Sequence, residues 1–257
     1  MSFHQNNFFS SILMRNVPVN VILPTPTEAE LQSGYKWPTI WLLHGLSDDA
    51  SAWARKTNLE ALIDADYPFA IVMPQTDRGF YNNIKDGQQY FDFISTELID
   101  YMRYIFPLDS SPDKNIVMGN SMGGYGALRL GLTFPDAFAG IVALSPATDL
   151  TAFEREQSAL LPEFNLIFKD QDLEHSSVAI PYLLEKTSSS TVARLKIYMA
   201  TGTADFLREM DLQARTRFET KFKDNFTWHE SQGHHNWRLW NNELPSVLDW
   251  CTEIFDQ

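Results

Sequence analysis

Cysteine is almost absent from this chain, since Cys251 is the only one among 257 residues. A single cysteine excludes an internal disulfide and argues against a zinc site built from thiolates. Cys251 lies in an apolar helical stretch near the C-terminus, so we expect it to pack in the core. Long apolar runs are also missing, because none approaches the ~20 residues that span a bilayer. We therefore expect no membrane partner.

Basic residues are scarce as well. The chain has 20 Lys and Arg against 33 Asp and Glu, which gives a formal net charge of −13. This charge argues against nucleic acid and anionic membrane surfaces as partners. The first seven residues lack the basic segment and following apolar segment of a secretory signal, so a cytoplasmic location is expected. Whether the chain forms a homo-oligomer stays open.

Apolar residues make up 44% of the chain, enough for a large core. No internal repeat, low-complexity tract or interdomain linker interrupts the 257 residues, so we expect one domain over 1–257. Strand-like and helix-like segments alternate, which predicts an α/β protein with a mostly parallel sheet covered by helices on both faces. Residues 149–190 break this alternation. We interpret them as a cap-like insertion over the active-site edge.

The expected elements follow from short apolar runs and from helical spacing of apolar residues. We expect strands at 39–43, 70–73, 115–120, 140–144, 195–200 and 226–230, with one or two short strands within 10–23. We expect helices at 53–66, 90–106, 121–134 and 208–223, and a last helix that ends at about 255.

A serine stands at the sharpest predicted turn of the chain. The residues Gly119-Asn120-Ser121-Met122-Gly123 follow an apolar strand and precede a helix. A strand, a tight turn and a helix are the context in which G-x-S-x-G acts as a nucleophile elbow. The glycines allow a close approach of backbone that a Cβ would prevent. Ser121 is therefore the candidate nucleophile.

A serine nucleophile needs a base and an acid that orients it. In proteins with this elbow, the acid and then the histidine follow the serine along the chain. Asp205 lies in a compact turn after a late strand, which favours it over Asp149, while Asp172 and Asp211 fit no such turn. His234 and His235 follow the last strand, and both could reach the serine.

Two backbone amides are needed to stabilise an oxyanion. Met122, next after the serine, is one candidate donor. The other is Leu46, in the loop after an early strand, where His44 is expected to hold the loop in place. The histidines lack the spacing of known metal-binding motifs, so no metal is expected. Trp53, Tyr81, Tyr125 and Trp237 are candidate substrate contacts, although aromatic residues more often pack in a core.

Most of the chain resembles the esterase D (putative esterase) family of α/β hydrolases, and within it the bacterial tributyrin esterases. The resemblance is carried by five segments: 42–49 with Trp53, 73–75 with 80–81, 119–128, 202–206, and 233–237 with Trp240. The serine and histidine motifs are specific to the family, whereas residues 149–190 carry no specific motif of it.

The resemblance implies which histidine is the base. The family's catalytic histidine is followed two residues later by an aromatic residue, and His235 with Trp237 fits that spacing whereas His234 does not. It also implies the Leu46 and Met122 amides as oxyanion donors and requires no cofactor. Family members that hydrolyse S-formylglutathione carry a cysteine near the position of Asp48, which this chain lacks.

We therefore expect a serine carboxylesterase that hydrolyses small-molecule, short-chain acyl esters through an acyl-enzyme. The alternatives are a feruloyl or acetyl-carbohydrate esterase, or a thioesterase of the S-formylglutathione type, on the same Ser121, Asp205 and His235. A peptidase and a catalytically silent hydrolase fold that serves as a binding protein are weaker alternatives.

Overall fold

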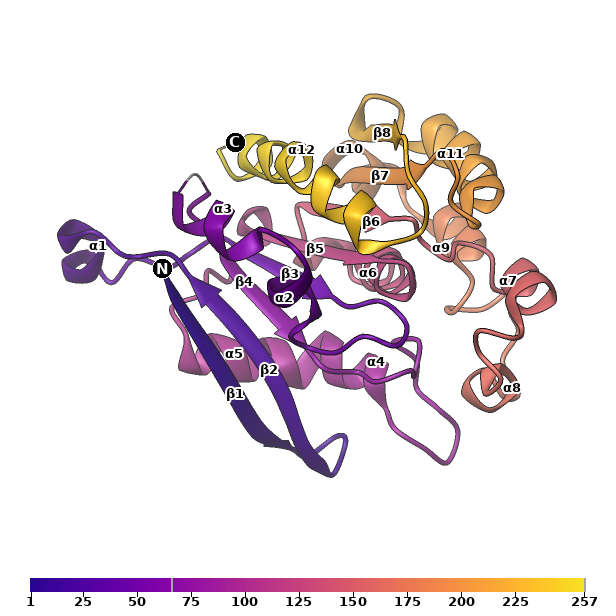
Figure 1. Ribbon diagram of the computed structural model, residues 1–257, viewed down its shortest axis with the longest axis horizontal. Coiled ribbons are helices and arrows are strands. Elements are labelled where there is room, and N and C mark those ends of the chain that lie inside the picture. Colours follow the sequence, from indigo (N-terminus) through magenta and orange to yellow (C-terminus); the bar gives the residue numbers. More distant parts are fainter. Residues whose placement is uncertain (66, 257) are drawn as a thin grey trace.

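The computed structural model describes residues 1–65 and 67–256 and is built on one eight-stranded sheet (Figure 1). The strand order is β1-β2-β4-β3-β5-β6-β7-β8. β2 runs antiparallel to both β1 and β4, and all other neighbours are parallel. The strands are β1 (Ser2–Ser10), β2 (Arg15–Leu23), β3 (Thr39–Leu43), β4 (Ala70–Pro74), β5 (Asn115–Asn120), β6 (Gly140–Leu144), β7 (Lys196–Gly202) and β8 (Phe226–Ser231).

The central strands are buried on both faces, because alternate side chains enter two separate cores. In β3, Trp41 and Leu43 belong to one apolar cluster, and Ile40 and Leu42 belong to the other. One face is covered by α2 (Ala52–Lys56), α3 (Leu59–Ala65) and α12 (Trp237–Phe255). The opposite face is covered by α4 (Tyr90–Asp92), η1 (Phe93–Glu97), α5 (Leu98–Ile105), α6 (Met122–Thr133) and α11 (Arg208–Phe222).

Four short helices fill the connection between β6 and β7. They are α7 (Leu150–Gln157), α8 (Phe164–Ile167), α9 (Ile180–Lys186) and α10 (Ser189–Arg194). Figure 1 shows α7 and α8 at the edge of the molecule, whereas α9 lies closer to α6 and α11. Phe153 and Phe164 nevertheless join the main apolar core, so this segment packs against the rest of the chain.

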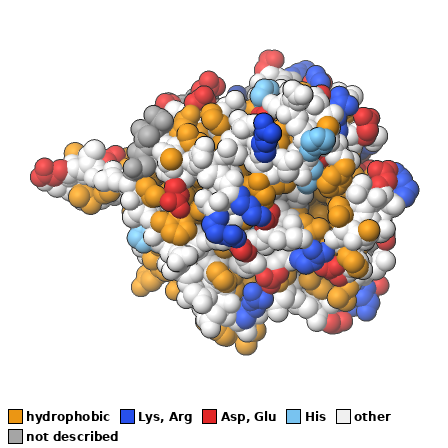
Figure 2. Space-filling model, in the orientation of Figure 1, with side chains coloured by type: hydrophobic (Ala, Val, Ile, Leu, Met, Phe, Trp, Pro, Cys, Tyr) orange, Lys and Arg blue, Asp and Glu red, His pale blue; other side chains and the backbone are white. Residues whose placement is uncertain are grey.

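The remaining α-helix, α1 (Glu28–Ser33), stands out from the body of the protein (Figures 1 and 2). On the face drawn in Figure 2, acidic and basic side chains are interspersed rather than gathered by sign. Within the described part of the chain, no helix combines the length and the apolar character needed to cross a membrane.

The mostly parallel sheet with helices on both faces is confirmed, but several local expectations were wrong. β1 was not predicted, because its polar residues have low strand propensity and one of its faces is exposed at the sheet edge. The helix expected at 53–66 is two helices, α2 and α3, and the prediction for Asp66 itself lies outside the described residues. The helix expected at 90–106 is confirmed over 90–105, with a π-helical turn, η1, within it.

Candidate active site

Ser121 occupies the turn between β5 and α6 with a strained backbone. Its φ of 54° and ψ of −118° lie outside the regions that a side chain normally tolerates. Two positions before and two positions after the serine, only glycine fits. A Cβ on Gly119 would lie 2.3 Å from the Gly123 carbonyl oxygen, and a Cβ on Gly123 would lie 2.4 Å from that of Leu43. The close backbone packing holds the Ser121 side chain above the end of the sheet.

His235 connects the serine to an acid. Its Nε2 lies 2.8 Å from Ser121 Oγ, and its Nδ1 lies 2.9 and 3.0 Å from the two carboxylate oxygens of Asp205. Because a carboxylate only accepts hydrogen bonds, Nδ1 carries the proton. The lone pair of Nε2 then faces the serine hydroxyl, which is the arrangement a general base requires.

The loops that carry the acid and the histidine are tied together. Asp205 is 6% exposed and accepts a second hydrogen bond, of 2.9 Å, from the Leu207 amide. The Ala204 amide donates to the Gly233 carbonyl over 2.8 Å, which joins the loop after β7 to the loop after β8. These bonds position the carboxylate before any substrate binds.

Aromatic side chains hold the His235 ring on two sides. Its centroid lies 4.3 Å from Phe206 and 5.0 Å from Trp240, which meets it edge-on at 86°. The Trp240 indole in turn donates to Ser145 Oγ over 3.2 Å. The neighbouring His234 is exposed and makes none of these contacts. The structure therefore brings His235, and not His234, to the serine.

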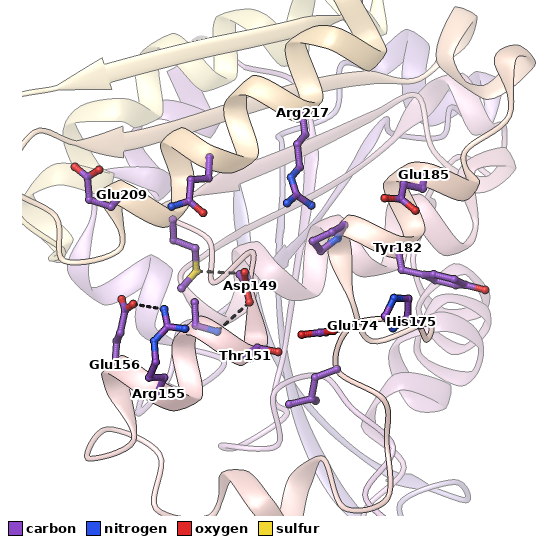
Figure 3. A pocket seen from close by; sticks show the side chains of 15 residues that line it. Asp149, Thr151, Arg155, Glu156, Glu174, His175, Tyr182, Glu185, Glu209 and Arg217 are labelled. Atoms are coloured by element: carbon purple, nitrogen blue, oxygen red, sulfur yellow. Dashed lines mark hydrogen bonds and ion pairs between the residues drawn. The ribbon is translucent and has the colours of Figure 1, made fainter.

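Asp149, the alternative acid, has a different role. Its carboxylate accepts a hydrogen bond of 2.9 Å from the Ala152 amide and caps the start of α7. It lines a separate cleft of about 520 Å³ between α7, α9 and α11, together with Arg155 and Arg217 (Figure 3). Ser121 and His235 are not among the residues that line this cleft.

The loop after β3, which carries Leu46, is fixed by buried hydrogen bonds. The His44 ring donates from Nδ1 to the Gly45 carbonyl (2.8 Å) and accepts at Nε2 from the Thr76 amide (3.1 Å). Burial lowers the pKa of His44, so the ring stays neutral in this position. As predicted from the sequence, His44 lies within the fold rather than at the serine.

Three of the four predicted substrate contacts lie in the core instead. Trp53, Tyr81 and Tyr125 are at most 1% exposed and do not line the cavity that contains Ser121. Trp53 donates to the Leu43 carbonyl over 3.1 Å, and Tyr81 donates to the His44 carbonyl over 2.8 Å. Both side chains therefore hold the start of the Leu46 loop through hydrogen bonds made within the core. Tyr125 bonds the Val178 carbonyl (2.9 Å), and burial raises its pKa to about 12.

Ser121 opens into a cavity of about 410 Å³, which Leu46, Met122 and Trp237 also line. One part of the lining is apolar and largely aromatic: Phe80, Phe153, Leu160, Phe206 and Trp240. Another part is polar: Ser47, Asp48, Lys56 and Asn236. Phe153, Leu160, Phe206 and Lys56 were missed as site residues. The first two come from the segment between β6 and β7, which the sequence placed over the active-site edge without indicating which of its side chains face the serine.

Among the described residues, no group of three or more His, Cys, Asp or Glu side chains is arranged to hold a metal ion. The side chains around Ser121 suit acyl transfer, since a nucleophile, a base and an acid are joined by hydrogen bonds. Two backbone amides, those of Leu46 and Met122, belong to residues that line the same cavity.

Comparison with known proteins places this site in context. A family model described as putative esterase matches residues 10–251. An acetyl esterase of Caldicellulosiruptor saccharolyticus is 29% identical over 268 residues, which cover 100% of both chains. FphF, a fluorophosphonate-binding serine hydrolase of Staphylococcus aureus, is 27% identical with a TM-score of 0.87 over 97% of this chain and 98% of that chain. An S-formylglutathione hydrolase (FrmB) of the same organism is 26% identical with a TM-score of 0.82 and the same shares. These likenesses confirm the expected α/β-hydrolase fold.

Proposed function

The chain belongs to the putative esterase family and is a serine hydrolase that acts on ester bonds, and on this premise we propose that it is a carboxylesterase whose nucleophile is Ser121. The observation that carries the proposal is the chain of hydrogen bonds from Ser121 Oγ through His235 to Asp205, with distances of 2.8, 2.9 and 3.0 Å.

In the first half of the reaction, Ser121 Oγ attacks the ester carbonyl while His235 Nε2 takes the hydroxyl proton. Asp205 stabilises the resulting imidazolium through Nδ1. The Leu46 and Met122 amides donate to the oxyanion of the tetrahedral intermediate, a contribution of about 2.7–4 kcal/mol for each donor. The imidazolium returns its proton to the leaving alcohol, and the acyl group stays on Ser121.

In the second half, a water molecule attacks the acyl-enzyme. His235 takes a proton from the water, the same two amides stabilise the second oxyanion, and the proton then returns to Ser121 Oγ as the carboxylic acid leaves. Every proton transfer uses His235, and no step requires a metal or cofactor.

The proposed substrates are esters of short-chain acids, as in the tributyrin-type esterases that the sequence resembles. A cavity of about 410 Å³ supports a small-molecule substrate. Phe153 and Leu160 reach it from the segment between β6 and β7, which supports the proposal that residues 149–190 act as a cap. The acetyl esterase relative agrees with a short acyl group.

A second candidate is an esterase of aromatic acids such as ferulic acid. The aromatic side chains of Phe80, Phe153 and Phe206 line the cavity and would stack on a phenyl ring. Hydrolysis of acetyl, butyryl, feruloyl, acetyl-sugar and thioester substrates by the same preparation decides between the candidates. The short-chain proposal requires the highest kcat/KM on acetyl or butyryl esters.

The nucleophile is tested by Ser121→Ala with p-nitrophenyl acetate as substrate. We expect turnover to fall to the background rate while the melting temperature is retained. A matched pair tests the base: His235→Ala should lose activity by several orders of magnitude, and His234→Ala should not. Near-wild-type turnover of Ser121→Ala would remove the basis of the proposal.

A further inference from the structure

A carboxylate lies inside the loop that presents the Leu46 amide. The Asp48 amide donates to the Gly45 carbonyl over 3.2 Å, which closes the loop into a tight turn. Asp48 Oδ2 lies 3.4 Å from the position that a Cβ on Gly45 would occupy, so the side chain folds back over the loop. This side chain is only 10% exposed. Its negative charge is therefore poorly screened by solvent.

A carboxylate in this place opposes the proposed reaction. The transition state develops a negative charge at the oxyanion, and the Gly45–Leu46 peptide group is one of the two groups that would stabilise it. Charges near a protein surface still interact strongly over several ångströms when water is excluded from between them. An unpaired Asp48 would repel the oxyanion and cancel part of what the Leu46 amide contributes.

Lys56 lies where it neutralises this carboxylate. Its Nζ is 2.5 Å from Asp48 Oδ1 and 5.2 Å from the centroid of the Trp237 ring. Lys56 is the last residue of α2, and Trp53 in the same helix bonds the end of β3. The helix and the loop are thus held together, and the ammonium group stays at the wall of the cavity.

We propose that Lys56 is a positioning residue for the reaction: by pairing with Asp48 it keeps the loop of Leu46 electrostatically favourable to the oxyanion. This inference rests on the proposed function, because it needs the oxyanion to form beside Leu46. It assigns Lys56 no contact with the reacting atoms, so its effect should be transmitted entirely through Asp48.

The chain offers a matched control in the adjacent ion pair. Arg55 Nη2 lies 3.1 Å from Asp49 Oδ2, and these two residues neighbour Lys56 and Asp48 in the same helix and the same loop. Both side chains are more than half exposed, and neither lines the cavity of Ser121. Arg55→Met therefore removes a surface ion pair of the same elements, for which little effect is expected.

The test is a charge-compensation series on p-nitrophenyl acetate hydrolysis. Lys56→Met should lower kcat/KM about tenfold, mostly through kcat, since it leaves Asp48 unpaired. The double variant Asp48→Asn/Lys56→Met should recover to within about threefold of wild type, because the charge to be neutralised is gone. Lys56→Arg, which keeps a positive charge beside Asp48, should lose less activity than Lys56→Met, and Arg55→Met should retain activity.

Affinity for a trifluoromethyl ketone reports on the oxyanion site itself, and its recovery in the double variant, which also lacks the ion pair, separates charge compensation from mere support of the loop. Such a ketone adds to the serine and forms a tetrahedral oxyanion, so Lys56→Met should weaken its binding about tenfold and the double variant should restore it. An unchanged Lys56→Met, an unrecovered double variant, or a loss equal to that of Arg55→Met would overturn the proposal. These outcomes are distinct from failure of the proposed function, in which Ser121→Ala would keep hydrolysing the substrate.

Discussion

Replacing Asp205 by asparagine should change which nitrogen of His235 carries the proton. The Leu207 amide donates to Asp205 Oδ1 over 2.9 Å, so an asparagine would place its carbonyl oxygen there and its NH₂ group at the position of Oδ2, 3.0 Å from His235 Nδ1. An NH₂ group at that position repels Nδ1–H and donates to a bare Nδ1, and the carbonyl oxygen already accepts from Leu207, so the tautomer with its proton on Nε2 is favoured. Nε2–H then faces Ser121 Oγ and is unable to take the hydroxyl proton.

The size of the effect follows from that exchange of tautomers. The variant loses both the general base and the charge that stabilises the imidazolium, while the Leu46 and Met122 amides remain. The corresponding substitution in the Ser-His-Asp triad of serine proteases lowers kcat about 10⁴-fold, or roughly 5.5 kcal/mol, and we expect a loss of 10³- to 10⁴-fold here. Since asparagine has nearly the same shape, folding should be retained.

The assay is kcat for p-nitrophenyl acetate at pH 7.5, with the melting temperature measured on the same preparations. Asp149→Asn is the control for the alternative acid, and Asp211→Asn is the control for a second buried carboxyl group. Both should keep activity within about threefold. A loss below tenfold in Asp205→Asn, or a larger loss in Asp149→Asn, would refute this account of the hydrogen-bond chain.

Three further predictions concern stability and the support of the site. Gly123→Ala should lower the melting temperature by roughly 6–12 °C, because its Cβ would meet the Leu43 carbonyl oxygen at 2.4 Å. Gly34→Ala has open space around the new Cβ but a φ of 67°, and it should lower the melting temperature by only roughly 2–4 °C. Trp53→Phe leaves the Leu43 carbonyl without its buried indole donor, so it should lower the free energy of unfolding in urea by about 1–3 kcal/mol and also lower kcat/KM. Unchanged kinetics would contradict a role of Trp53 in holding the loop of Leu46. Burial, and then the nearby charge of Asp205, raises the pKa of the Asp211 carboxyl well above its usual value. Above pH 4 the unfolded chain loses this proton and the folded protein keeps it, so wild-type stability should fall relative to Asp211→Asn by up to about 1.4 kcal/mol per pH unit. Parallel pH–stability curves for the two proteins would contradict this.

The parts of the site that depend on residues close together in the sequence could be predicted. Residues 115–120 form a strand and Ser121 follows it, because apolar runs, glycines and helix starts are local signals. The acid Asp205 was favoured for its compact turn, and its proximity to His235 agrees with that choice. The role of each residue remains a proposal, to be tested as described above.

Other parts depend on packing that local sequence does not encode. Trp53 and Tyr81 were expected at the cavity, since an aromatic side chain suits both a binding site and a core. Their indole and hydroxyl groups instead reach buried carbonyls of the β3 loop. Phe153 reaches the cavity through the β6–β7 segment, where helices are short and no periodicity indicated their arrangement. Long-range contacts, rather than propensity, decide these positions.

The central claim is that Ser121, activated by His235, is the group that becomes acylated. Its most direct test is mass spectrometry of the protein after reaction with a fluorophosphonate, followed by mapping of the modified peptide. The account predicts one adduct, on Ser121, that is absent from Ser121→Ala, forms far more slowly in His235→Ala, and forms at the normal rate in His234→Ala. An adduct on another residue, or labelling of Ser121→Ala at the wild-type rate, would contradict it.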